Sequence, residues 1–105
     1  MRSTSTVSER GVNRERDIRH LLENEGWICF RSAGSKGVCD IVALRAGDRP
    51  RLIEVKSTAQ GPYERFGPSE RARLSDAALL AGADALLAYW PPRGTLRWIP
   101  EKEWP

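Results

Sequence analysis

Apolar and polar positions follow two distinct patterns along this chain, one typical of helices and one typical of strands. Residues 11–25 carry apolar side chains at helical spacing, and Gly26 is well placed to end a helix there. A second helix is predicted from Pro68, which suits a first helical turn, to about Ala81. Short runs rich in Ile, Val, Leu and aromatic residues, bounded by turn residues, predict strands at 27–31, 39–44, 52–56, 85–90 and 95–99. The predicted order α-β-β-β-α-β-β indicates an α/β fold, a mixed β-sheet flanked by helices.

The second and third predicted strands form a hairpin that carries three charged residues. Their connection, residues 45–50, has Gly and Asp at its centre. If the hairpin folds symmetrically about Gly47, Asp40 lies opposite Glu54, and Lys56 shares a face with Glu54 because side chains alternate along a strand. Opposed like charges destabilise a sheet. A bound Mg²⁺ or Mn²⁺ would account for them, since both ions prefer hard oxygen ligands.

A simpler interpretation of the same residues stays open. Glu-x-Lys is common in strands by chance, and two charges on the solvent face of an edge strand need no function. A single-residue bulge would also make the pairing of Asp40 with Glu54 diagonal instead of direct.

Two further features could contribute to a site. Glu15 is three residues before Ile18 and seven before Leu22, so it lies on the buried side of the first helix or at its edge. An unpaired buried carboxylate is costly, and an ion pair with Arg19, four residues on, would be the structural alternative. Residues 32–37 form a loop of glycines, serines and a lysine that could offer N–H groups and hydroxyls to a phosphate.

Composition indicates one small domain, with residues 1–10 as a flexible tail and 11–105 folded. No apolar run approaches the roughly 20 residues of a membrane helix, and the N-terminal segment lacks the apolar core of a secretory signal. Cys29 and Cys39 are expected to be reduced thiols in a cytoplasmic protein, although a disulfide between them stays open. A net charge of +3, with only three lysines among 17 basic residues, weakly favours a polyanionic partner.

The C-terminal third is rich in large apolar side chains for so short a segment. Some of them should remain outside a small core and could form an interface between two copies of the chain. The alternative is that they pack beneath the second helix. These residues are Leu86, Leu87, Tyr89, Trp90, Leu96, Trp98 and Ile99.

These motifs together resemble those of the archaeal-type Holliday-junction resolvases, within the PD-(D/E)xK nuclease superfamily. The resemblance covers about residues 11–100. The matching segments are Arg14-Glu15 in the first helix, Arg31-Ser-Ala-Gly-Ser-Lys36, Asp40-Ile-Val, Leu52-Ile-Glu-Val-Lys-Ser57 and the last strand, Leu96-Arg-Trp-Ile99.

The resemblance implies a structure-selective, divalent-metal-dependent endodeoxyribonuclease that resolves four-way DNA junctions by paired, symmetric hydrolysis. Mg²⁺, replaceable by Mn²⁺, would be held by Glu15, Asp40 and Glu54, and Lys56 would position or activate the attacking water. DNA contacts are expected from Arg14, Arg31, Ser32, Ser35 and Lys36. The resemblance also implies a homodimer in the cytoplasm, or in the host cytoplasm if the chain is encoded by a virus.

Three departures from the family pattern keep other functions open. Cys39 stands where the superfamily name places Pro, Glu64 and Glu70 interrupt the arginines of the second half, and the chain ends soon after the last strand. The alternatives are another PD-(D/E)xK endonuclease, acting in restriction, repair or packaging, and a catalytically silent DNA-binding module.

Overall fold

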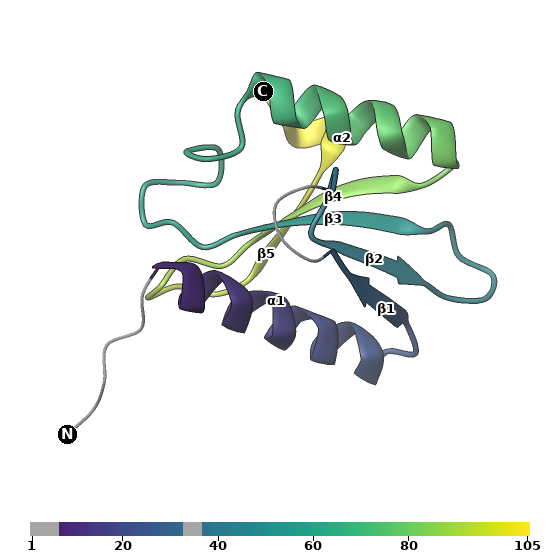
Figure 1. Ribbon diagram of the computed structural model, residues 1–105, viewed down its shortest axis with the longest axis horizontal. Helices are drawn as coiled ribbons and strands as arrows, with labels where there is room; N and C mark the ends of the chain where they lie inside the picture. The colour runs from purple at the N-terminus through teal and green to yellow at the C-terminus, as the bar shows by residue number, and fades with distance from the viewer. Residues whose placement is uncertain (1–6, 33–36) are drawn as a thin grey trace.

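The computed structural model describes residues 7–32 and 37–105 as a five-stranded sheet with one helix on each side (Figure 1). The α-β-β-β-α-β-β order predicted from the sequence is confirmed. The elements are α1 (Val7–Asn24), β1 (Ile28–Arg31), β2 (Ile41–Leu44), β3 (Arg51–Lys56), α2 (Pro68–Ala81), β4 (Asp84–Tyr89), β5 (Arg97–Pro100) and a 3₁₀ turn, η1 (Glu101–Glu103).

The sheet is mixed, and its strands lie in sequence order from β1 to β5. All neighbouring pairs are antiparallel except β3 and β4, which are parallel. Parallel neighbours need a crossover connection, and α2 supplies it between β3 and β4.

Each helix covers one face of the sheet and closes one core, because successive side chains of a strand point to opposite faces. Ile53 lies in the core beneath α1, whereas its neighbour Leu52 lies in the core beneath α2. The α1 core contains Ile18, Leu22, Trp27, Ile41, Ala43, Ile53, Val55 and Ala88. The α2 core contains Cys39, Leu52, Phe66, Leu74, Ala78, Ala83, Ala85, Leu87, Tyr89 and Ile99.

The β2–β3 hairpin has the register expected for a turn centred on Gly47. Ile41 pairs with Ile53 and Ala43 with Arg51, and the N–H of Asp40, just before the paired residues, donates to the Ile53 carbonyl, which brings Asp40 beside Glu54. Gly47 has a φ of 83°, a left-handed conformation that glycine adopts without steric cost. The predicted juxtaposition of Asp40 and Glu54 therefore follows directly from the hairpin geometry.

Helix α1 begins at Val7, four residues before the predicted start of the folded domain, and residues 1–6 lie outside the described part of the chain. The apolar stripe that located this helix starts well inside it, so the pattern could not mark the first turns. Single-domain organisation stays a prediction.

The C-terminal segment after β5 is packed against the body of the protein. After η1, the Trp104 ring meets Phe66 edge to face, with 5.0 Å between ring centroids. The Trp104 indole N–H donates a hydrogen bond of 3.1 Å to the carbonyl of Ile99. A large aromatic ring with a satisfied polar group thus closes one end of the α2 core.

The large apolar residues of the C-terminal third mostly pack inside the molecule. Leu87, Tyr89 and Ile99 are buried, whereas Trp98 remains 38% exposed. The most exposed apolar strand residues lie instead on β1, where Ile28 and Phe30 are 62% and 57% exposed. They pair with Leu44 and Val42 of β2, beyond the part of the sheet that α2 covers (Figure 1).

Cys29 and Cys39 are free thiols, Cys29 half-buried and Cys39 buried, so a disulfide between them is not formed. Among the helices of the described residues, none has the length and apolar character needed to cross a bilayer.

The packing of Trp104 leads to a prediction about stability. Trp104→Ala removes the contact with Phe66 and the bond to Ile99, and should lower the free energy of unfolding by about 1–3 kcal/mol. Urea denaturation is the measurement. Leu80→Ala is the control, because Leu80 is 89% exposed and its truncation should change stability by less than about 0.5 kcal/mol. Equal effects of the two variants would show that the C-terminal segment does not contribute to the fold.

Candidate active site

A cavity of about 450 Å³ gathers most of the residues singled out in the sequence. It lies where α1, the end of β1, the start of β2 and the end of β3 meet. Its lining comprises Gly11, Val12, Glu15, Arg31, Ser32, Gly37, Cys39, Asp40, Glu54 and Lys56. The four predicted catalytic residues therefore face one space, although they come from two separate elements, α1 and β3, and from the segment before β2.

Asp40 is held in place by the β2–β3 hairpin itself. Its backbone N–H donates to the carbonyl of Ile53 at 2.9 Å, and its carbonyl accepts the N–H of Ser32 at 2.9 Å. Its side-chain Oδ2 accepts the N–H of Val55 at 2.7 Å, in the place of a strand carbonyl. The carboxylate thus closes the hairpin ladder and shortens β2, which begins at Ile41 and not at the predicted residue 39.

Glu54 and Lys56 are neighbours on one face of β3. The Lys56 Nζ lies 3.2 Å from Glu54 Oε2, and both side chains are mostly buried. Burial and the adjacent negative charge of Asp40 raise the pKa of Glu54 to about 7, although Lys56 opposes this shift. Burial also raises the pKa of Asp40, against the hydrogen bond from Val55 and the charge of Lys56. The folded protein without metal therefore disfavours full ionisation of this pair of carboxyl groups, and a bound cation would favour it.

Glu15 enters the cavity from α1 and is paired across the site. Arg31 Nε donates to Glu15 Oε1 at 3.0 Å. Burial raises the pKa of Glu15, and the hydrogen bond from Arg31 opposes that shift. Arg19 acts on Glu15 only as a nearby charge, so the structural alternative, an ion pair between Glu15 and Arg19, is not what the structure shows.

The carboxylates suit a hard divalent cation, and two of them are already adjacent. Asp40 and Glu54 offer oxygen ligands at a point where their mutual repulsion raises the pKa of Glu54. Across residues 7–32 and 37–105, however, no three Asp, Glu, His or Cys side chains lie close enough together to hold a metal ion. Glu15, the third acidic residue of the cavity, is paired with Arg31.

The residues expected to contact DNA are divided by the structure. Arg31 and Ser32 line the cavity, whereas Ser35 and Lys36 lie outside the described residues. Arg14 is directed elsewhere: its guanidinium donates to the carbonyl of Pro91 at 3.1 Å and lies 4.3 Å from the centre of the Trp90 ring. In this conformation Arg14 joins α1 to the turn after β4.

Gly37 and Cys39 are cavity residues that sequence reasoning did not assign to the site. A Cβ at Gly37 would overlap the hydroxyl of Ser32, so a larger residue at this position would require the Ser32 side chain to move. The serine- and glycine-rich composition of the loop was the available signal. Burial raises the pKa of the Cys39 thiol to about 11, which leaves it uncharged and unsuited to be a nucleophile or metal ligand.

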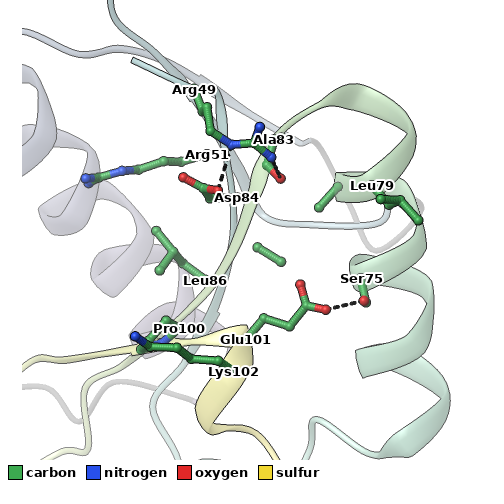
Figure 2. Close-up of a pocket in the computed structure, with 12 residues that line it drawn as sticks. Arg49, Arg51, Ser75, Leu79, Ala83, Asp84, Leu86, Pro100, Glu101 and Lys102 are labelled. Carbon is green, nitrogen blue, oxygen red and sulfur yellow. Dashed lines mark hydrogen bonds and ion pairs between the residues drawn. The ribbon is translucent and has the colours of Figure 1, made fainter.

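A larger cavity of about 720 Å³ lies at the other end of β3 and β4 (Figure 2). Its acidic groups already have partners: Asp84 pairs with Arg49 at 3.0 Å, and Glu101 accepts a hydrogen bond from Ser75. Its volume is greater, but it lacks the adjacent carboxylates and lysine of the smaller cavity. The chemistry therefore points to the smaller cavity as the active site.

Comparisons with known proteins show the family of the chain. The family model of the archaeal Holliday junction resolvase (Hjc) matches residues 6–103. The crossover junction endodeoxyribonuclease Hjc of Methanocaldococcus jannaschii is 51% identical over 54 residues, which span 51% of this chain and only 39% of that protein.

A solved structure provides a comparison over more of the chain. It is that of Archaeoglobus fulgidus Hjc, described as a Holliday junction resolvase from an archaeal hyperthermophile. It matches with a TM-score of 0.75 and 32% identity, covering 89% of this chain and 74% of the other. The family match spans nearly the whole sequence, and the chain belongs to the archaeal Holliday junction resolvase (Hjc) family.

Proposed function

We propose that this protein is a divalent-metal-dependent endodeoxyribonuclease that resolves four-way DNA junctions, with Mg²⁺ as its usual metal and Mn²⁺ able to replace it. The observation that carries the proposal is that Glu15, Asp40, Glu54 and Lys56 face one cavity in a chain of this family. Carboxylates held beside a lysine suit phosphodiester hydrolysis, in which negative charge develops on a group that is already anionic.

In this proposal Asp40 and Glu54 hold the metal, and Glu15 completes the ligand set. When bound, the cation supplies positive charge beside the phosphate and makes a nearby water more acidic. The hydrogen bond from Val55 fixes one oxygen of Asp40, whose carboxyl group lines the cavity. Hairpin folding therefore orients this ligand before any metal arrives.

Lys56 acts by charge and position. Its Nζ is held 3.2 Å from Glu54 and lies in the same cavity. From there the ammonium can orient the attacking water and stabilise the negative charge that develops on the phosphate oxygens. Because it is mostly buried, its charge is less screened by solvent than that of a surface lysine.

DNA contacts are assigned to Arg31 and Ser32 at the mouth of the cavity, together with Ser35 and Lys36 of the connecting loop. Arg14 stays a predicted contact, since its guanidinium is engaged with Pro91 and Trp90. Contacts of this kind read the phosphate backbone, so selectivity for a junction comes from branched shape and not from base sequence.

A homodimer fits both the reaction and the surface of the chain. Resolution needs two symmetric cuts, and the described residues form one Asp40/Glu54/Lys56 site. The uncovered face of the β1–β2 pair, with Ile28, Phe30 and Leu44 exposed, is the proposed interface. A two-fold axis through that face would set two active sites against two equivalent DNA strands.

A cleavage panel tests the proposal. The protein is incubated with Mg²⁺ and end-labelled four-way junction, flap or linear duplex. Paired, symmetric nicks are expected in the junction, with little cutting of the duplex. Equal cleavage of all three substrates would instead favour a general endonuclease, and no cleavage of any would favour a silent DNA-binding module.

The carboxylates should serve chemistry and not the fold. Asp40→Asn and Glu54→Gln should each lower the cleavage rate by about 10²-fold or more, and leave junction binding largely intact. Without metal, stability should hold or rise, because a pair of opposed charges is lost while the Asn side chain can still accept the Val55 N–H. Single-turnover cleavage, gel-shift binding and urea denaturation measure the three effects. A variant that unfolds, or that cleaves at the wild-type rate, contradicts the metal-site assignment.

The raised pKa of Glu54 predicts a pH dependence of stability without metal. The folded state favours the protonated carboxyl, so this contribution is fully present below about pH 4.5 and is lost as pH rises through about 7. In EDTA, Glu54→Gln should therefore become more stable relative to wild type across that range, by on the order of 2 kcal/mol. Urea denaturation at several pH values is the measurement. Saturating Mg²⁺ should remove the trend, and a trend of opposite sign would refute the environment assigned to Glu54.

Charge placed on the β1–β2 face should separate the dimer. Phe30→Glu is expected to reduce the mass in solution from twice 11.8 kDa to one chain, since a buried unpaired carboxylate is costly. Light scattering at micromolar concentration measures the mass. Leu80→Glu adds the same charge at a leucine on α2 that is 89% exposed, and should leave the dimer intact. A wild-type mass of one chain, both free and with junction bound, contradicts the dimer itself.

A further inference from the structure

Arg31 occupies an unusual place among the charges of the cavity. It ends the edge strand β1, pairs in the sheet with Ile41, and so lies directly beside Asp40. Its Nε–H donates to Glu15 at 3.0 Å, and its charge also acts on Asp40. A guanidinium therefore neutralises the one proposed metal ligand that stands apart from the other two.

Each carboxylate in the cavity interacts with a different positively charged or hydrogen-bond-donating group in the absence of a metal. Glu54 has Lys56 at 3.2 Å, Asp40 has the N–H of Val55 at 2.7 Å, and Glu15 has Arg31 at 3.0 Å. Lys56 and Val55 belong to β3, as Glu54 does, and the hairpin fixes all of them. Arg31 is the partner at an edge, on a long and flexible side chain.

We propose that Arg31 is a placeholder that exchanges partners: it neutralises Glu15 while metal is absent, and the arriving divalent cation releases it to bind a DNA phosphate. The inference rests on the proposed function, because it takes Glu15 as a metal ligand and DNA as the substrate. It makes metal binding and DNA binding support each other through one side chain.

Exposure supports this direction of exchange. The Arg31 side chain is 39% exposed and that of Glu15 only 16%, so the arginine can turn to solvent while the glutamate stays in the cavity. Ion pairs that reach solvent are weak, whereas a divalent cation attracts three carboxylates at once. An arginine fork is also well suited to phosphate oxygens.

The opposing hypothesis is that Arg31 is a fixed support that holds Glu15 ready for the metal. The two hypotheses predict opposite effects of removing the guanidinium. If Arg31 is a placeholder, its loss frees Glu15 and strengthens metal binding. If Arg31 is a support, its loss leaves the Glu15 side chain without a fixed position and weakens metal binding.

Calorimetric titration of the free protein with Mn²⁺ separates these outcomes. Arg31→Gln should bind Mn²⁺ about 5-fold more tightly than wild type, or more. Arg19→Gln is the matched control, since Arg19 also lowers the pKa of Glu15 through its charge, and it should have a clearly smaller effect. Arg73→Gln, an exposed arginine on α2, should have none. Unchanged or weaker binding by Arg31→Gln would overturn the placeholder role.

A second measurement uses DNA without metal. In EDTA, Arg31→Gln introduced into the wild-type protein should lower its affinity for the junction only slightly, because Arg31 is already engaged with Glu15. In a Glu15→Gln background Arg31 is free, and the same substitution should weaken binding about 5-fold or more. Equal losses in both backgrounds would mean that Arg31 is not sequestered by Glu15, and the inference would fail.

Failure of the inference and failure of the proposed function have different signatures. If wild type binds Mn²⁺ and cleaves junctions but Arg31→Gln does not bind Mn²⁺ more tightly, the function stands and the exchange is rejected. If wild type neither binds Mn²⁺ nor cleaves a junction, the proposed function is rejected and the exchange with it. Circular dichroism of each variant shows whether the fold is kept, and Arg31→Lys, which keeps the charge but not the fork, should give an intermediate metal affinity.

Discussion

The hydrogen bond from the Val55 N–H to the Asp40 carboxylate is the constraint on which the site depends. A side-chain oxygen takes the place of a backbone acceptor where the β2–β3 ladder ends. The bond ties a charged group to the end of the hairpin, beside Glu54, and Lys56 lies on the same face of β3 as Glu54. Folding of the hairpin and assembly of the carboxylate pair are therefore one event.

The negative charges that this arrangement brings together destabilise the folded protein when no metal is bound. Burial raises the pKa of both Asp40 and Glu54, and the charge of Asp40 raises that of Glu54 further, which means that the folded state disfavours their charged forms. Local partners offset part of this cost: Lys56 for Glu54 and Arg31 for Glu15. Such an arrangement is typical of a site whose charge balance is completed by a ligand, since a purely structural cluster would gain from neutral residues.

The rest of the fold acts as a rigid support for this corner. The α1 core beneath Ile18 and Leu22 fixes the helix that carries Glu15, and the α2 core clamps the parallel β3–β4 pair from the other side. Both helices leave one face of the β1–β2 pair uncovered (Figure 1). The site and the proposed dimer surface thus share the β1–β2 pair, so that pairing of two chains through this face would also set the distance between two active sites.

Local pattern determined much of this protein. Apolar periodicity and turn residues were enough for the order of elements, and the symmetry of the loop about Gly47 was enough for the juxtaposition of Asp40 and Glu54, because hairpin register depends on a few neighbouring residues. Long-range contacts decided the rest. The partner of Glu15 is Arg31, 16 residues away on β1, and not Arg19 on the same helix. Trp104 packs on Phe66, and the most exposed apolar strand residues are Ile28 and Phe30 of β1, whereas Leu87, Tyr89 and Ile99 are buried. Sequence spacing carries information about neighbours within an element, whereas these contacts arise between elements that only the packed sheet brings together.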